Sequence, residues 1–91
     1  MKQSDAKQHE KPLKALANRR RLEIVSYLLK NREATVSDLS EHLKISFKAT
    51  SKHLAVLLGA DIVTREQQGL FSLYSIATNL PPVAKKVLAA L

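Results

Sequence analysis

The junction between two amphipathic helical stretches constrains the fold of this chain most. Residues 35–43 and residues 46–58 each repeat apolar side chains at helical spacing, and only Lys44 and Ile45 separate them. The hydroxyl side chain that begins each stretch is a good N-cap, and Asp38 suits a capping-box arrangement in the first. Two helices joined this closely predict a helix-turn-helix.

The remaining segments predict further helices and one hairpin. Helices are expected to begin at Pro12, after Asn18 as an N-cap, and near Leu80. Two runs that favour strands, residues 62–66 and 70–76, flank a glycine-containing turn. The expected fold class is therefore mainly α with a small β-hairpin, a winged helix-turn-helix in which the hairpin is the wing.

Length and composition limit how such a fold gains stability. The winged helix-turn-helix is expected over residues 12–91, behind a polar, flexible N-terminal tail at residues 1–11. A chain of 91 residues has a thin core, and without cysteine it has no disulfide to support that core. Oligomerisation is the remaining source of stability that we expect.

The charge balance favours a polyanionic partner. The chain carries a net charge of +7 and has a pI of about 10, which favours DNA, RNA or an anionic surface over a neutral partner. An inert basic surface is the alternative. No apolar run approaches the ~20 residues of a membrane span, and the N-terminus lacks a signal-peptide core, so we expect a cytoplasmic protein.

The helix over residues 46–58 is the strongest candidate for a nucleic-acid contact. Its solvent side carries Lys48, Ser51 and Lys52, with the two lysines one turn apart. Lysine can donate hydrogen bonds to guanine or to phosphate, and serine to either. We therefore expect these three residues to contact bases and backbone in a major groove of double-stranded DNA.

Three flanking residues of the same helix have two interpretations each. Ser46 and the free N–H groups of the first turn suit a phosphate, or simply cap the helix. Phe47 is expected either to touch a thymine methyl or to act as a staple against the preceding helix. His53 is expected either to donate to a phosphate or to be a satisfied, partly buried histidine.

The hairpin and one basic cluster add weaker candidates. Arg65 and the tip residues Gln67, Gln68 and Gly69 would contact the minor groove or the backbone, or they would form a plain turn. Three arginines open the second helix, where cations oppose the helix dipole and therefore need a partner. For Arg20 that partner is expected to be phosphate. Glu23 or a helix C-terminal carbonyl is the intramolecular alternative, which is favoured for Arg21.

Three segments together resemble the ArsR/SmtB family of prokaryotic winged-helix repressors over about residues 13–76. The family's "ALadptRLrIL" is similar to LKALANRRRLEIVSYL, residues 13–28. Its "vsELaehLglS" is similar to ATVSDLSEHLKIS, residues 34–46. The Ser-x-His-Leu element formed by Ser51, His53 and Leu54, followed by the hairpin, is specific in combination.

The resemblance implies a homodimeric, sequence-specific repressor that binds a palindromic operator. It implies that the first and last helices pair across a two-fold axis, with a purely intramolecular core as the alternative use of their apolar residues. The matching positions are Leu13, Leu16, Val83, Val87, Leu88 and Leu91. The alternative function is a winged-helix protein-interaction module controlled by a partner protein.

The family's metal-sensing residues are missing from this sequence. Its cysteine pair falls on Thr35 and Ser37, whose hydroxyls do not replace thiolates for soft metals. The last helix carries no His, Asp or Glu, and the histidines elsewhere lack ligand spacing. We therefore expect no metal and no cofactor. An enzyme is also disfavoured, because the sequence has no carboxylate pair, nucleophile–base set or Gly-rich phosphate loop.

Overall fold

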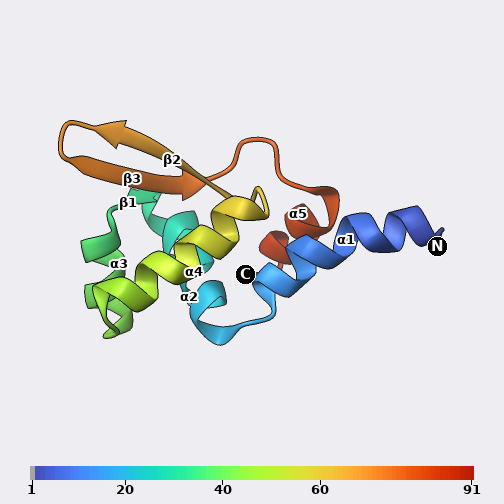
Figure 1. Cartoon of the computed structure of the whole chain (residues 1–91), viewed down its shortest axis with the longest axis horizontal. Helices are drawn as coiled ribbons and strands as arrows, with labels where there is room; N and C mark the ends of the chain where they lie inside the picture. Colours follow the sequence, from blue (N-terminus) through green and yellow to red (C-terminus); the bar gives the residue numbers. More distant parts are fainter. Residues whose placement is uncertain (1) are drawn as a thin grey trace.

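The computed structural model describes residues 2–91, and the described chain forms five helices and three strands. The helices and strands follow the order that the sequence predicts, helix-turn-helix and hairpin included, with one additional short strand (Figure 1). They are α1 (Gln3–Leu16), α2 (Arg19–Asn31), β1 (Glu33–Ala34), α3 (Val36–Leu43), α4 (Phe47–Gly59), β2 (Val63–Gln68), β3 (Phe71–Ile76) and α5 (Pro82–Ala89).

Side-chain caps define the starts of α2, α3 and α4. The side chain of Asn18 accepts from the backbone N–H of Arg21 at 3.1 Å. Thr35 and Asp38 form a complete capping box, with bonds of 3.0 and 3.1 Å. The Ser46 hydroxyl accepts from the backbone N–H of Ala49, in the first turn of α4, at 3.0 Å. The predicted caps are confirmed, and they fix the short connection between α3 and α4.

Helix α1 differs from the prediction, because it begins at Gln3 and not at Pro12. The predicted tail is therefore wrong over residues 3–11, which are helical; Met1 lies outside the described residues. Pro12 lies inside the helix and is buried. Mostly polar residues such as Gln, Lys and Glu suggested a tail, but the same residues are good helix formers on a solvated face.

The sheet is antiparallel, with strand order β1-β3-β2. The pairing of Gln68 with Phe71 leaves Gly69 and Leu70 as the two central residues of the turn. Gly69 has φ +61°, while Leu70 keeps a negative φ, which is a type II′ turn with glycine in its required first position. The predicted turn at residues 67–69 is therefore corrected to residues 69–70.

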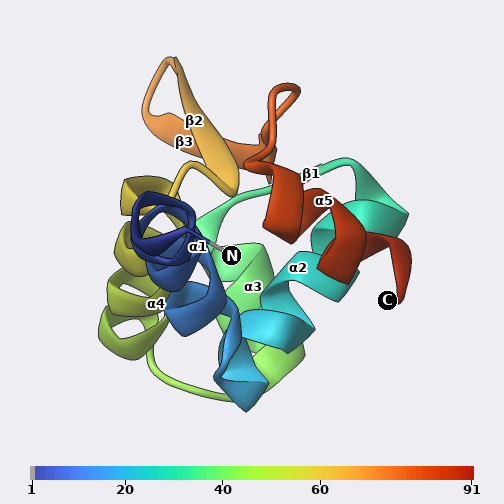
Figure 2. The ribbon, with the colours of Figure 1, turned by 90° about the vertical axis from the view of Figure 1, so that its right-hand side faces the viewer.

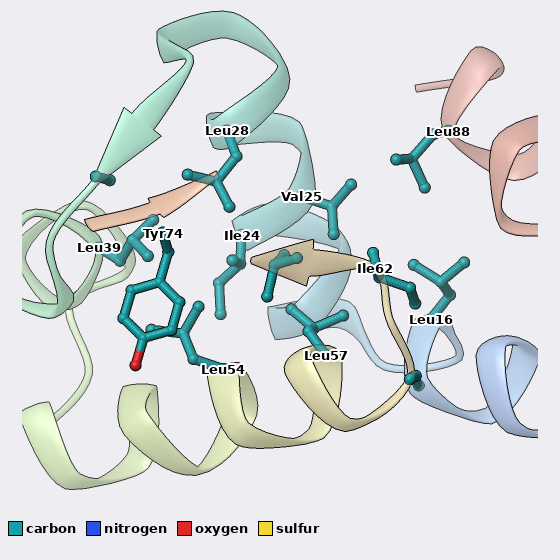
Figure 3. Packing of buried hydrophobic residues seen from close by; sticks show 14 of the residues in the cluster. Leu16, Ile24, Val25, Leu28, Leu39, Leu54, Leu57, Ile62, Tyr74 and Leu88 are labelled. Atoms are coloured by element: carbon teal, nitrogen blue, oxygen red, sulfur yellow. The ribbon is translucent and has the colours of Figure 1, made fainter. Parts of the chain in front are cut away.

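The core lies between α2, α3, α4 and the sheet, and it extends to α1 and α5. Leu54 and Leu57 point from α4 toward Ile24 of α2 (Figure 3). Leu29 of α2 lies outside this core and is 43% exposed. The largest fully buried side chains are Ile24, Leu28, Leu39, Leu54, Leu57, Ile62, Val25, Val63 and Thr50.

Helix α4 and the β2–β3 hairpin lie on one side of the molecule, and α5 lies on the other (Figure 2). The N-terminal half of α1 extends beyond the rest of the chain (Figure 1). Helix α1 packs against both α4 and α5, so it lies between these two sides. No helix in the described residues combines the length and the apolarity that crossing a membrane requires.

Candidate nucleic-acid interface

The solvent face of α4 presents two lysines. Thr50, Leu54 and Leu57 are buried at 0% exposure, and this fixes the rotation of the helix about its axis. The opposite side therefore faces solvent, with Lys48 and Lys52 exposed and Ser51 half-buried between them. Within residues 2–91, neither lysine is within ion-pair distance of a carboxylate.

The beginning of α4 has unbonded first-turn N–H groups within the helix and an exposed aromatic side chain beside them. Ser46 satisfies one first-turn N–H with its hydroxyl, and the remaining first-turn N–H groups have no partner within the helix. Thr50 is also tied to this turn, because its hydroxyl donates to the Ser46 carbonyl at 2.9 Å. Phe47 is 59% exposed, which leaves its ring available for contact and weakens the staple interpretation.

Arg21 connects three helices through one guanidinium group. Its Nε donates to the carbonyl of Ala15, and a terminal nitrogen donates to the carbonyl of Lys14 at 3.3 Å, both at the end of α1. The other terminal nitrogen lies 3.3 Å from Nδ1 of His53 on α4. Because guanidinium only donates, Nδ1 is the acceptor, and the neutral ring carries its proton on Nε2. The predicted pairing of Arg21 with a helix C-terminal carbonyl is confirmed.

His53 is thus a satisfied, half-buried histidine on the side of α4 that faces Arg21, which was one of its two expected roles. Burial lowers the pKa of the His53 imidazole below its usual value, and the positive charges of Arg21 and Arg20 lower the pKa further. The folded chain therefore favours the neutral ring, whose Nε2–H is a donor.

The lowered pKa of His53 predicts that acid destabilises the fold. The unfolded chain binds the proton more readily than the folded one, so the free energy of unfolding increases with pH. This contribution is complete above the ordinary imidazole pKa of about 6.5 and is lost as the pH falls through the lower folded-state pKa. Urea denaturation at pH 7.5 and pH 5 should show a lower midpoint in acid.

Replacing His53 tests which group causes this acid sensitivity. His53→Gln keeps an acceptor for Arg21 but cannot take up a proton, so the difference between the two pH values should shrink. His9→Gln is the matched control, because His9 of α1 makes no hydrogen bond to an arginine within the described chain. An equal effect of both substitutions would contradict the assignment to His53.

Arg20 has acceptors within the chain. One of its terminal nitrogens lies 3.4 Å from the Glu23 carboxylate and 3.4 Å from the carbonyl of Leu43 at the end of α3. The Arg20 side chain is 34% exposed. Its guanidinium, which was predicted to bind phosphate, already contacts these two acceptors within the chain. Arg19, which was not among the predicted DNA-binding residues, is 81% exposed, and its Nε lies 3.9 Å from the Glu23 carboxylate, which is a long ion pair. It is the most available cation of the three.

The hairpin has one exposed cation, Arg65, and an internally bonded turn. The Gln67 amide donates to the Gly69 carbonyl at 3.1 Å and accepts from the Ser72 hydroxyl at 2.8 Å. Gln67 therefore braces the turn, whereas the neighbouring Gln68 is exposed and makes no side-chain hydrogen bond in the described part of the chain.

Two exposed apolar residues, one in the turn and one directly after it, were not predicted as site residues. Leu70 is 97% exposed and Phe71 is 65% exposed. Gly69 could have indicated this exposure from the sequence, because a two-residue type II′ turn begins with glycine and places the next residue at the outermost point of the hairpin.

The proposed dimer residues divide into two groups. Leu13 and Leu91 are 42% and 49% exposed, and Val83 and Val87 are half-buried. The other two are core residues of the chain itself: Leu16 is 3% exposed and Leu88 is 6% exposed. These two serve the intramolecular alternative, because α1 already packs against α5 within the chain. The prediction that they present surface to a partner is corrected.

No group of three His, Asp or Glu side chains within residues 2–91 is arranged to hold a metal ion. Thr35, at one of the two positions where the family resemblance expects a metal-binding cysteine, caps α3 with its hydroxyl.

The family match and the most similar known sequences agree on one family of bacterial regulators. Residues 18–65 match the family described as "Bacterial regulatory protein, arsR family". The arsenical resistance operon repressor of Bacillus subtilis is 36% identical over 70 residues, which are 77% of this chain and 67% of that protein. The transcriptional activator HlyU of Vibrio cholerae is 39% identical over 67 residues, which are 74% of this chain and 61% of HlyU.

Solved structures share the fold over nearly the whole chain. HlyU from Vibrio cholerae superposes with a TM-score of 0.83 at 32% identity, and covers 99% of this chain and 92% of that one. The homodimeric winged helix-turn-helix DNA-binding domain of Mb0332 from Mycobacterium bovis, studied by NMR, gives a TM-score of 0.81 at 25% identity. That match covers 96% of this chain and 77% of that one.

Proposed function

Because this chain belongs to the ArsR family and is a DNA-binding transcriptional regulator, we propose that it is a homodimeric repressor of a palindromic operator. The observation that carries the proposal is the solvent face of α4, where Lys48 and Lys52 stand one turn apart and pair with no carboxylate of residues 2–91. A helix anchored on its opposite side can lie in a major groove with such a face against the bases. Occupation of a promoter would then block transcription.

Each candidate residue has a role in this complex. Lys48 and Lys52 donate to guanine edges or phosphates, and Ser51 contacts either. The Ser46 end of α4 holds a phosphate, and Phe47 contacts a thymine methyl. The supporting contacts come from His53 Nε2, from Arg20, and from the hairpin residues Arg65, Gln67, Gln68 and Gly69.

The homodimer would form through the surface of α1 and α5. Leu13 and Leu91 are exposed apolar side chains there, and half-buried Val83 and Val87 continue the surface. Helix α5 lies across the molecule from α4 and the hairpin, so pairing through α5 and the adjoining face of α1 would leave the DNA side of both chains open (Figure 2). A two-fold pair would place its two copies of α4 about one DNA turn apart, near 34 Å, on a palindrome.

Selection from a random duplex pool tests the proposal. The purified protein should enrich a palindrome, bind it as a dimer by mass, and lose affinity steeply between about 50 and 200 mM salt as counterions are released. A promoter–reporter fusion carrying that palindrome should be silenced by the protein. Enrichment of no sequence would contradict the operator, and an activated reporter would contradict repression. Binding without salt dependence would favour the protein-interaction module.

A charge at Leu13 should dissociate the dimer. Leu13→Glu places a carboxylate in the proposed apolar interface at an exposed position of α1, so the single chain should still fold. Sedimentation should show a monomer, and operator affinity should fall because each half-site is bound separately. Gln8→Glu introduces the same charge about 140° away around the helix. Loss of the dimer in both variants, or in neither, would contradict this interface.

A further inference from the structure

The tip of the β2–β3 hairpin is the most exposed apolar point of the described chain. Leu70 is 97% exposed, and the adjacent Phe71 is 65% exposed. Side chains that stay in water add nothing to the hydrophobic stabilisation of the fold. A neighbouring Leu and Phe at the outermost turn therefore need another explanation.

The turn holds these side chains in a fixed position. Gly69 adopts the positive φ that a type II′ turn requires, and Gln67 bonds to Gly69 and to Ser72 across the turn. Farther along the hairpin, the hydroxyls of Thr64 and Ser75 lie 3.2 Å apart. A braced two-residue turn loses little conformational entropy when it binds, and it is the narrowest end of the hairpin.

The charge of the hairpin does not favour a purely electrostatic contact with DNA. Over residues 63–76, Arg65 and Glu66 are the charged side chains, and their charges cancel. The tip nevertheless lies on the same side of the molecule as α4 (Figure 2). The hairpin therefore brings apolar surface, and little net charge, to the proposed DNA side.

We propose that Leu70 and Phe71 enter the minor groove next to the major-groove site of α4 and wedge between stacked base pairs, which bends the DNA. The inference rests on the proposed function, because it needs α4 to position the hairpin. Leu and Phe are among the side chains that partly unstack base steps in this way, and such wedges bend duplexes by about 20–90°. A protein partner fits less well, because two side chains are far smaller than the ~800 Å² per partner of a stable interface.

The wedge adds sequence preference without hydrogen bonds to bases. Pyrimidine–purine steps such as TA and CA unstack most easily, so the free-energy cost of the wedge is smallest there. The operator should therefore favour such a step under the hairpin, outside the bases that α4 contacts.

Bending and base stacking can be measured on the duplex that the wild-type protein selects. Energy transfer between dyes at the duplex ends reports the bend, and 2-aminopurine at the step under the hairpin reports unstacking. The double variant Leu70→Ala, Phe71→Ala should lose the 2-aminopurine increase and at least roughly half of the bend. Leu70→Met should retain both signals, since methionine also wedges between bases. Neither variant removes a cation, so the slope of log affinity against log salt concentration should equal that of the wild-type protein.

Leu29→Ala is the matched control, because it makes the same leucine-to-alanine change at a 43% exposed position of α2 and leaves the hairpin intact. It should keep the bend and the 2-aminopurine signal, and thermal denaturation should confirm that all variants are folded. If the wild-type protein binds but every variant bends DNA equally, or if Leu29→Ala loses as much as the double variant, the wedge proposal is wrong and the DNA-binding function stands. Failure of the wild-type protein to select any duplex overturns both.

Discussion

Replacing Lys48 and Lys52 with alanine should lower operator affinity by at least roughly thirtyfold. A well-placed contact to a base is worth about 1–3 kcal/mol, so two such contacts are worth about 2–6 kcal/mol, and each ~1.4 kcal/mol corresponds to a tenfold step in affinity. Both side chains are exposed on α4, so their loss leaves the core unchanged. Binding to the selected palindrome, measured by fluorescence anisotropy, provides the test.

The salt dependence separates a specific contact from general attraction. If both lysines contact phosphates, the slope of log affinity against log salt should become shallower by about 0.9 for each. Lys85→Ala with Lys86→Ala is the matched control, because it removes the same charge from the exposed side of α5, away from α4 (Figure 2). An equal loss of affinity in the two double variants would show that net charge alone attracts DNA to this chain.

Leu54→Ala should have the largest effect on stability, with a loss of about 2–5 kcal/mol in the free energy of unfolding. Leu54 is 0% exposed and points from α4 into the core, so alanine leaves a cavity beneath the recognition face (Figure 3). The free energy of unfolding of native domains is only about 5–15 kcal/mol, so such a loss is a large share of the stability of the chain. Thermal denaturation should shift by about 10 °C or more.

Leu70→Ala is the control with the same chemical change at a position that is 97% exposed. It should change the free energy of unfolding by no more than about 0.5 kcal/mol. If both substitutions destabilised equally, burial in α4 would not explain the effect. If Leu54→Ala were neutral, the packing of α4 on α2 would be wrong.

Local signals predicted the helix-turn-helix because the chemistry that forms it is local. Thr35 and Ser46 cap α3 and α4 through bonds to residues three positions along, and the same spacing is visible in the sequence. Thr50, Leu54 and Leu57 recur at helical spacing and are fully buried. The solvent face that carries the two lysines follows directly from these positions.

Contacts between distant segments were beyond prediction from the sequence. Arg20 and Arg21 needed partners, but only the packing of α1 and α3 against α2 shows which carbonyl groups are within reach. Leu16 and Leu88 have the same polarity as Leu13, and burial within the chain distinguishes them only once α1 meets α5. Polarity also concealed the first half of α1, since a solvated helix and a tail use similar residues.

Arg21 joins the end of α1 to the middle of α4, with two carbonyl groups on one side of its guanidinium and His53 on the other. In the proposed homodimer, α1 faces the partner and α4 faces DNA. The angle between these helices then determines how far apart the two copies of α4 stand. By fixing this angle, the single side chain of Arg21 would limit which spacings between operator half-sites one dimer can bind.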